Sequence, residues 1–370
     1  MIEFQGNGSK GVMSCRKFVW INLIGIFSLL LIGGAVVFTV DPFYHYHGPW
    51  FNLPVVLYNE IYQTPGTARN FNYDSAIVGS SMTENFRASW FDEDFGWDTV
   101  KLCYEGAGTD DLKAILEQVY KGNRQVKNIL LTIDDYQMVS DSSTVAIERP
   151  EYLYNENPFD DVYYLFNRDA LKASLCRIGD GIGGKGYEVD DAYNFSGKYE
   201  FSKAQVLRDA RPFRENMKAN PPKEETPEDA FLQACEDNME NLVPFVETHP
   251  ETEFIVVFSP YSIMNWEKKV LAGTLKAQLR ADAYVIGEFL SYENVRVFYF
   301  QDEYEMITDL DRYMDTCHYK EEYNHYIEQC IRDGKNEVTE ENYRERIENM
   351  YRIVSGYDFE SIWDGEDIFM

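Results

Sequence analysis

The pattern of apolar and polar residues divides the chain into one long apolar segment and a series of short ones. The long segment runs from Phe18 to Val40 and carries no charged residue. About 20 apolar residues suffice to cross a bilayer as a helix. The segment at 18–40 is therefore predicted to be a transmembrane anchor.

The charges around this segment predict its orientation. Lys10, Arg16 and Lys17 precede it, whereas the chain after it is strongly acidic. The positive-inside rule then puts residues 1–17 in the cytoplasm as a tail, and residues 41–370 outside. A cleaved signal peptide is the alternative, but the segment is too long for a typical signal, and no clear cleavage site follows it. We expect a single-pass protein of the cell membrane with an extracellular domain.

Beyond the anchor, short apolar runs alternate with longer amphipathic patterns. The runs predict strands at 76–78, 98–103, 126–133, 253–259 and 295–300. Helical patterns lie between most of them, and helices at 323–331 and 340–354 follow. Strands separated by helices imply parallel βαβ units. The expected fold class is therefore a three-layer α/β domain with about five parallel strands.

One segment, from about 140 to 230, breaks this rhythm. It is rich in Tyr, Asn, Asp and Pro, and is predicted to be an insertion between the third and fourth strands, over the carboxyl edge of the sheet. Its glycine-rich stretch 179–186 fits nucleotide-binding patterns, but no strand precedes it, so a loop is expected. The predicted organisation is a juxtamembrane segment at 41–72 and an extracytoplasmic domain at 73–370.

Composition excludes some classes of function. With 63 acidic and 34 basic residues, the net charge of −29 repels nucleic acid. The 27 Tyr and 24 Phe favour a folded chain. The six cysteines are widely spaced, and His45 and His47 have no further ligand nearby in sequence, so neither a metal nor a cofactor is predicted.

The first predicted strand ends in Gly79-Ser80-Ser81, which carries the first candidate chemistry. A serine on a strand-to-helix turn has its hydroxyl above the carboxyl end of the sheet, near free N–H groups of the helix. We expect Gly79 to permit an unusual backbone turn. An ordinary turn with a helix cap also explains this pattern, and on this stretch either serine could be the nucleophile.

A serine nucleophile needs a base, and the chain has five histidines. His318 stands in Asp315-x-x-His318 after the fifth strand, a spacing that lets the carboxylate orient the imidazole. The glycine-rich turn at 104–109 follows the second strand and could bring a backbone N–H to an oxyanion. A capping aspartate, a surface histidine and a tight turn are the plain alternatives.

Together these motifs resemble the SGNH (GDSL-type) hydrolase superfamily over about residues 72–335. More closely, the chain resembles a membrane-anchored bacterial branch that is similar to the D-alanyl-lipoteichoic acid transfer protein and alginate-acetylation proteins. The motifs that carry this closer resemblance are Asp41-Pro42-Phe43, the stretch from Gly79 to Phe86, 150–154, 259–262 and Asp315-x-x-His318-Tyr319. The resemblance implies a flavodoxin-like SGNH fold.

The resemblance also implies roles for residues. Ser81, rather than Ser80, is expected to be the nucleophile, with His318 as base and Asp315 as its orienting acid. The N–H groups of Ser81 and Gly106 are expected to form the oxyanion hole. If the turn is shifted, Gly108 takes the place of Gly106.

The chain departs from the superfamily after the third strand. Many members have an asparagine there as a third oxyanion donor, whereas this chain has Asp134. An ionised aspartate cannot donate, so either Tyr136 or another group replaces the asparagine, or the hole has two donors. Asp134, Tyr136 and Tyr261 are the candidates for lining the substrate pocket.

The function implied is a serine esterase or O-acyltransferase that acts through an acyl-enzyme. Its substrates would be small esters or acyl esters of cell-surface glycans or teichoic acids, and its partner a membrane-bound O-acyltransferase. Sequence leaves hydrolysis and transfer open. The alternative is a non-catalytic scaffold for such an acyltransferase.

Overall fold

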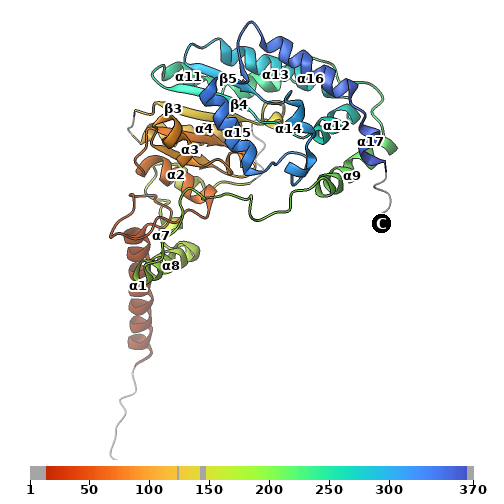
Figure 1. Cartoon of the computed structure of the whole chain (residues 1–370). Coiled ribbons are helices and arrows are strands. Elements are labelled where there is room, and N and C mark those ends of the chain that lie inside the picture. The colour runs from red at the N-terminus through yellow and green to blue at the C-terminus, as the bar shows by residue number, and fades with distance from the viewer. Residues whose placement is uncertain (1–13, 123–124, 142–146, 365–370) are drawn as a thin grey trace, which may run out of the picture.

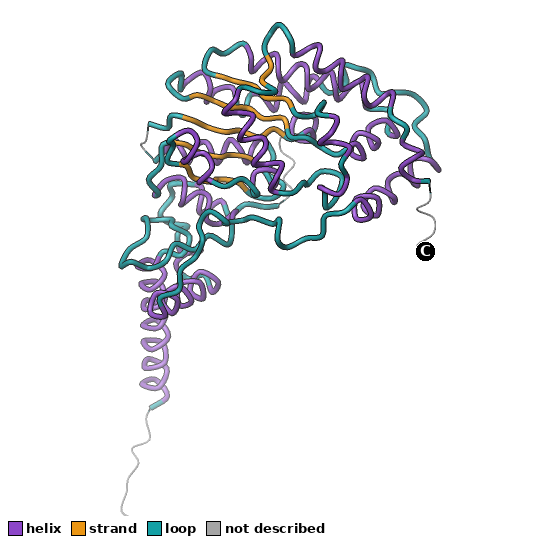
Figure 2. Tube along the Cα trace, in the orientation of Figure 1, coloured by secondary structure: helices purple, strands orange, loops and turns teal. Residues whose placement is uncertain are grey.

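The fold centres on a six-stranded sheet, whose strands Figure 2 shows in orange. Their order is β2-β1-β3-β4-β5-β6. The computed structural model describes residues 14–122, 125–141 and 147–364. The first five strands are parallel and β6 is antiparallel to β5. The strands are β1 (Ser75–Gly79), β2 (Thr99–Cys103), β3 (Asn128–Ile133), β4 (Glu253–Phe258), β5 (Val295–Tyr299) and β6 (Glu337–Val338). The prediction of an α/β domain with five parallel strands is confirmed; the two-residue β6 is too short to produce a pattern.

Alternate residues of the strands enter two separate cores, because successive side chains point to opposite faces of a sheet. Ile77, Leu130 and Ile255 pack on one face. Their neighbours Val78 and Leu131 pack on the other. Helices cover both faces (Figure 1). The helices of the domain, apart from α7 and α8, are α2 (Glu60–Asn70), α3 (Ala88–Phe95), α4 (Thr109–Lys121), α5 (Asp135–Val139), α6 (Glu151–Tyr154), α9 (Lys203–Ala219), α10 (Leu232–Met239), α11 (Val243–Thr248), α12 (Ile263–Leu271), α13 (Leu275–Leu290), α14 (Tyr304–Thr308), α15 (Glu321–Asp333), α16 (Tyr343–Gly356) and α17 (Phe359–Trp363).

A single apolar helix, α1 (Cys15–Val40), projects from this domain (Figure 1). It is long and apolar enough to cross a membrane. The helix begins three residues before the predicted segment. Its orientation across a membrane stays a prediction.

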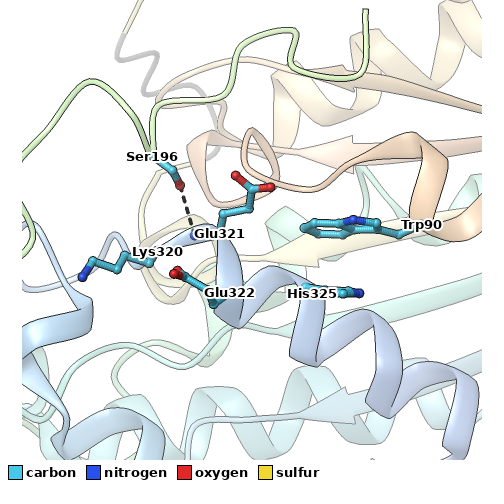
Figure 3. Close-up of a pocket in the computed structure, with 6 residues that line it drawn as sticks. All are labelled: Trp90, Ser196, Lys320, Glu321, Glu322 and His325. Atoms are coloured by element: carbon cyan, nitrogen blue, oxygen red, sulfur yellow. Dashed lines mark hydrogen bonds between the residues drawn. The ribbon is translucent and has the colours of Figure 1, made fainter. Parts of the chain in front are cut away.

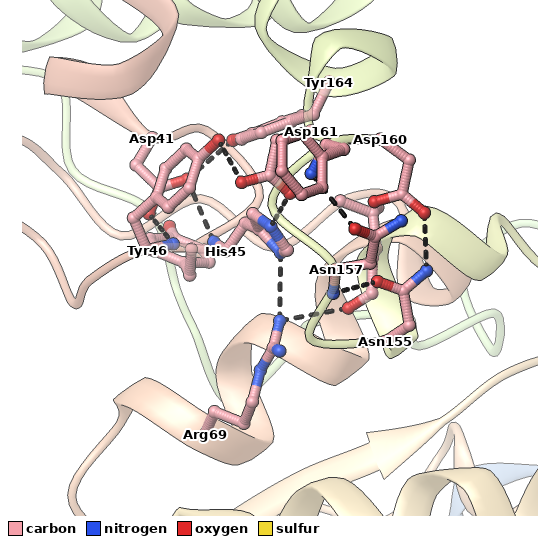
Figure 4. Close-up of polar contacts among 12 residues, drawn as sticks. Asp41, His45, Tyr46, Arg69, Asn155, Asn157, Asp160, Asp161 and Tyr164 are labelled. Carbon is pink, nitrogen blue, oxygen red and sulfur yellow. Dashed lines mark hydrogen bonds and ion pairs between the residues drawn. The ribbon is translucent and has the colours of Figure 1, made fainter.

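The exit from α1 is held by a polar cluster around Asp41 (Figure 4). Asp41 caps the helix in the left-handed conformation, with φ of 46°. Its carboxylate accepts hydrogen bonds from the backbone N–H groups of His45, Tyr46 and His47 at 2.7–2.9 Å, and from the Tyr164 hydroxyl at 2.6 Å. The helix is thereby fixed to the segment that follows it and to the distant Tyr164.

The two histidines of this segment have separate partners. The His45 imidazole lies between Asp161, at 3.1 Å, and the Arg69 guanidinium, at 2.9 Å (Figure 4). The His47 ring stacks on Trp50 with 3.5 Å between the ring centroids. The juxtamembrane segment is therefore a packed junction between α1 and the domain.

The predicted insertion at about 140–230 contacts both α1 and the carboxyl edge of the sheet. Its helices α7 (Val162–Leu165) and α8 (Arg168–Gly183) pack against α1, not over the sheet. A later part, around Phe195, reaches the carboxyl edge of the sheet. The prediction of a loop at 179–186 is wrong for its first five residues. They continue α8, whose buried face is held by Arg177, and Gly184 ends the helix with φ of 64°.

Gly79 is needed for close packing and not for an unusual backbone angle, because it is not among the residues with positive φ. A Cβ atom there would lie 2.1 Å from Thr132 Oγ1 and 2.5 Å from Thr83 Cγ2. We expect Gly79→Ala to lower the free energy of unfolding by about 1–3 kcal/mol, as overpacking does. Urea denaturation measures this. Gly356→Ala, where no atom lies within 4 Å of the added Cβ, is the control. Equal stability of the two variants would contradict this explanation.

Candidate active site

The turn after β1 gives its two serines different environments. Ser80 is buried, and its hydroxyl donates to Asp134. Ser81 begins a short 3₁₀ helix, Ser81–Thr83, and is partly exposed. The Thr83 hydroxyl donates to the Ser80 carbonyl at 2.5 Å and tightens the turn. Ser80 therefore stabilises the turn from its buried side, whereas Ser81 is accessible from solvent.

The loop after β5 is folded tightly around Asp315. One carboxylate oxygen of Asp315 accepts the backbone N–H groups of Cys317 and His318, both at 2.7 Å. The loop is fastened to the loop after β4, because Ser262 donates to the Thr316 carbonyl through its hydroxyl at 2.7 Å and its N–H at 3.2 Å. These contacts fix both the acid and the imidazole before any substrate binds.

The structure brings Ser81, His318 and Asp315 together in one hydrogen-bonded series. Ser81 Oγ lies 2.8 Å from His318 Nε2, and His318 Nδ1 lies 2.7 Å from Asp315 Oδ2. An ionised carboxylate can only accept, so Nδ1 carries the proton of a neutral imidazole. Nε2 then accepts the hydrogen bond of the Ser81 hydroxyl, which is the arrangement a general base requires.

The charges of this series support that protonation pattern. Burial lowers the pKa of His318, but the hydrogen bond and the charge of Asp315 raise it, and the net pKa lies above the ordinary 6.5. Burial raises the pKa of Asp315, but hydrogen bonds from His318 outweigh this effect, and the net pKa lies below the ordinary value. Asp315 is thus ionised at neutral pH and stabilises a protonated imidazole.

The glycine turn after β2 contains one amide that is engaged and one that is not. The Gly108 N–H donates to Asp111 at 2.9 Å and caps α4. Gly106 has φ of 71°. In the described part of the chain, no acceptor binds the N–H of Gly106 or that of Ser81. Of the two glycine candidates, Gly106 is therefore the one with an amide free to bind an oxyanion.

The side chain of Asp134, directly after β3, is buried beneath the turn after β1 and does not line a substrate pocket. The Asp134 carboxylate accepts the hydroxyls of Ser80 and, at 2.6 Å, of Tyr261. Both Asp134 and Tyr261 are almost completely buried. This corrects the expectation that they line the substrate pocket. Burial raises the pKa of Asp134 to about 6 despite these two hydrogen bonds. Tyr136 is more exposed, but its hydroxyl donates to the Ala107 carbonyl at 3.0 Å.

Two residues near His318 were missed from the sequence. Asn85 joins the two halves of the site, since its Nδ2 donates to the Tyr319 carbonyl at 3.1 Å and its Oδ1 accepts the Phe195 N–H at 3.0 Å. The Phe195 ring stands edge-on to the His318 imidazole, with 5.7 Å between centroids and an angle of 87°. Asn85 lies in the Gly79–Phe86 motif and could have been singled out, whereas nothing in the sequence marks Phe195.

A polar pocket of about 390 Å³ lies next to these residues (Figure 3). Ser196, which follows Phe195, accepts the Glu321 N–H at 3.0 Å. The Trp90 indole stacks on the His325 ring, with 4.4 Å between centroids. The pocket is lined by Trp90, Ser196, Lys320, Glu321, Glu322 and His325.

The site thus combines a hydroxyl, an imidazole and a carboxylate with two candidate amide donors at the carboxyl edge of a parallel sheet. No cluster of three or more candidate metal ligands occurs among the described residues. Neither a scan against protein-family models nor a search of curated proteins finds a match to this chain.

Proposed function

We propose that this protein is an extracytoplasmic serine esterase or O-acyltransferase of the SGNH type. The observation that carries the proposal is the series from Ser81 Oγ to His318 Nε2 and from His318 Nδ1 to Asp315 Oδ2, at 2.8 and 2.7 Å. The strand order β2-β1-β3-β4-β5 adds support, because flavodoxin-like sheets have this order and bind ligands at the carboxyl edge.

In the proposed reaction, Ser81 Oγ attacks the acyl carbon of an ester while its proton passes to His318 Nε2. The N–H groups of Ser81 and Gly106 bind the oxyanion. The intermediate collapses, the bond to the leaving alcohol breaks, and His318 returns the proton to that alcohol. Water or an acceptor hydroxyl then gives its proton to His318 and attacks the acyl-enzyme. The bond between the acyl carbon and Ser81 Oγ breaks, His318 returns the proton to Ser81 Oγ, and an acid or a new ester is released.

The proposed oxyanion hole has two donors, because both oxygens of Asp134 accept hydrogen bonds and the Tyr136 hydroxyl is used by Ala107. The loss of one donor costs roughly 100- to 1,000-fold in rate. We therefore expect turnover of activated esters to exceed that of alkyl esters. Acyl esters of cell-surface glycans or teichoic acids, and a membrane-bound O-acyltransferase as partner, are proposed from the sequence resemblance.

The same two-donor geometry favours a second candidate, a non-catalytic scaffold. Release of p-nitrophenol from p-nitrophenyl acetate by the purified full-length protein distinguishes the two. The esterase proposal predicts turnover that is lost in His318→Ala, and the scaffold predicts none in either protein. Added acceptor alcohols then separate transfer from hydrolysis, because transfer diverts the acetyl group into a new ester.

The pH dependence of this activity follows from His318. Its imidazole must be neutral to accept the Ser81 proton, and its pKa lies above 6.5. As pH falls through that pKa, kcat/KM is expected to fall about tenfold per unit. A profile from pH 5 to 9 measures this. An acid limb well below 6.5 would contradict the assignment of His318 as the base.

A further inference from the structure

The most exposed apolar side chains of the domain belong to the segments that adjoin α1, which are the segment after it and the region of α7 and α8. Outside α1, the four most exposed large apolar or aromatic side chains among the described residues are Phe159, Ile182, Phe51 and Tyr163, which are 65–86% exposed. Phe166 and Leu175 are 49% and 56% exposed. These six residues are called the apolar patch. Single exposed apolar residues are ordinary, but a group of them indicates a surface that binds something.

Helix α8 contributes an amphipathic face to the apolar patch. Leu171, Leu175, Ile178 and Ile182 recur at the spacing of one helical face. A second face, with Ala170, Ser174 and Arg177, is buried against the domain. On this apolar face, Leu171 lies against α1, whereas Leu175 and Ile182 stay exposed.

The contacts of α7 and α8 with α1 determine how far along α1, and hence how close to a membrane, these two helices lie. At Gly34 of α1, an added Cβ would lie 3.2 Å from the Phe166 ring, and at Gly33 it would lie 3.8 Å from Leu171. Gly34 precedes the end of α1 at Val40 by about 9 Å, given 1.5 Å per residue. Residues of α7 and α8 thus contact α1 beside its apolar stretch and below its exit. Figure 1 shows both helices alongside the upper part of α1.

Hydrogen bonds at the end of α1 fix this position of α7 and α8 along α1. Arg177 of α8 donates to the carbonyls of Val40, Asp41 and Pro54 at 2.8–3.3 Å. Tyr164 of α7 donates to the Asp41 carboxylate (Figure 4). Where α1 crosses a bilayer, α7 and α8 must therefore lie at its surface.

We propose that the apolar patch lies within the lipid bilayer, with α8 as an interfacial helix next to the transmembrane anchor. The aromatic residues of the patch are the types that favour the membrane interface. In this proposal the contact is mainly apolar, and two cations of the region, Arg168 and Lys185, have Asp169 and Asp180 beside them. The inference is independent of the proposed catalytic function.

The test uses the full-length protein in nanodiscs of zwitterionic phosphatidylcholine. A nitrobenzoxadiazole label is attached at Leu175→Cys or Ile182→Cys, with the exposed Cys15 and Cys176 changed to serine. The matched control is the native Cys176, labelled in a Cys15→Ser protein. It is exposed on the same helix but lies on the face shared with Asp169 and Asp180. All labelled sites are on the surface, so the substitutions leave the fold intact.

We expect the labels at 175 and 182 to show blue-shifted emission and to lose intensity when the lipids carry doxyl groups on their acyl chains. The label on Cys176 is expected to emit as in water and to resist quenching. Water-like emission at 182 would overturn the proposal. A blue shift without doxyl quenching would also overturn it, because the patch would then bind a second copy of the chain in place of lipid.

Discussion

Ser81→Ala is expected to abolish turnover of p-nitrophenyl acetate, with a loss in kcat on the order of 10,000-fold or more. The Ser81 hydroxyl is the group that lies 2.8 Å from His318 Nε2, and alanine leaves no atom to form the acyl-enzyme. Steady-state kinetics of the purified full-length variant measure the effect. The fold should be unaffected because Ser81 is partly exposed.

The matched control is Ser80→Ala. The Ser80 hydroxyl donates to the buried Asp134 and does not contact His318, so this variant should lose stability and keep measurable turnover. Comparable loss of activity in both variants, with equal stability, would contradict the assignment of the nucleophile.

Asp315→Asn is expected to lower kcat by about 10,000-fold, as removal of the orienting charge does in other serine enzymes. The amide can donate to His318 Nδ1, which favours the tautomer with the proton on Nε2 and removes the acceptor for Ser81. The acid limb of the pH profile should also move to lower pH, because Asp315 raises the pKa of His318. If the substitution only destabilised the fold, the acid limb of the pH profile would stay where it is in the wild type.

The control for this variant is Asp311→Asn, in the same stretch. Asp311 is exposed and accepts the Lys203 N–H at 2.9 Å, away from the imidazole. Near-normal kcat is expected there. If Asp315→Asn retained kcat within tenfold of the wild type with an unmoved acid limb, His318 would not depend on Asp315.

Periodicity predicted the parallel sheet because each strand is a buried apolar run bounded by turn residues. The loops after parallel strands open at the same edge of a sheet, so the sequence also allowed Ser81 and His318 to meet. The sequence indicated that a glycine is needed at position 79, but it suggested an unusual backbone turn as the reason, which is wrong. The cause is the distance to Thr132 on the neighbouring strand, which only the packed sheet reveals.

The rest depended on contacts between distant parts of the chain. Asp134 was expected at the pocket, but its carboxylate is turned inward by Ser80 and Tyr261. Phe195 lies beside His318, and Asn85 binds its N–H across 110 positions of sequence. Helix α8 contains three of the five glycines of the predicted loop, and its packing against α1 could not be predicted from composition.

The most direct test of the central claim is labelling by a fluorophosphonate probe, followed by mass spectrometry of the labelled peptides. Such a probe forms an adduct with a serine only when a base activates that serine. We expect one adduct, on Ser81, that persists in Ser80→Ala and disappears in His318→Ala. An adduct on another residue, no adduct in the wild type, or unchanged labelling in His318→Ala would contradict the account.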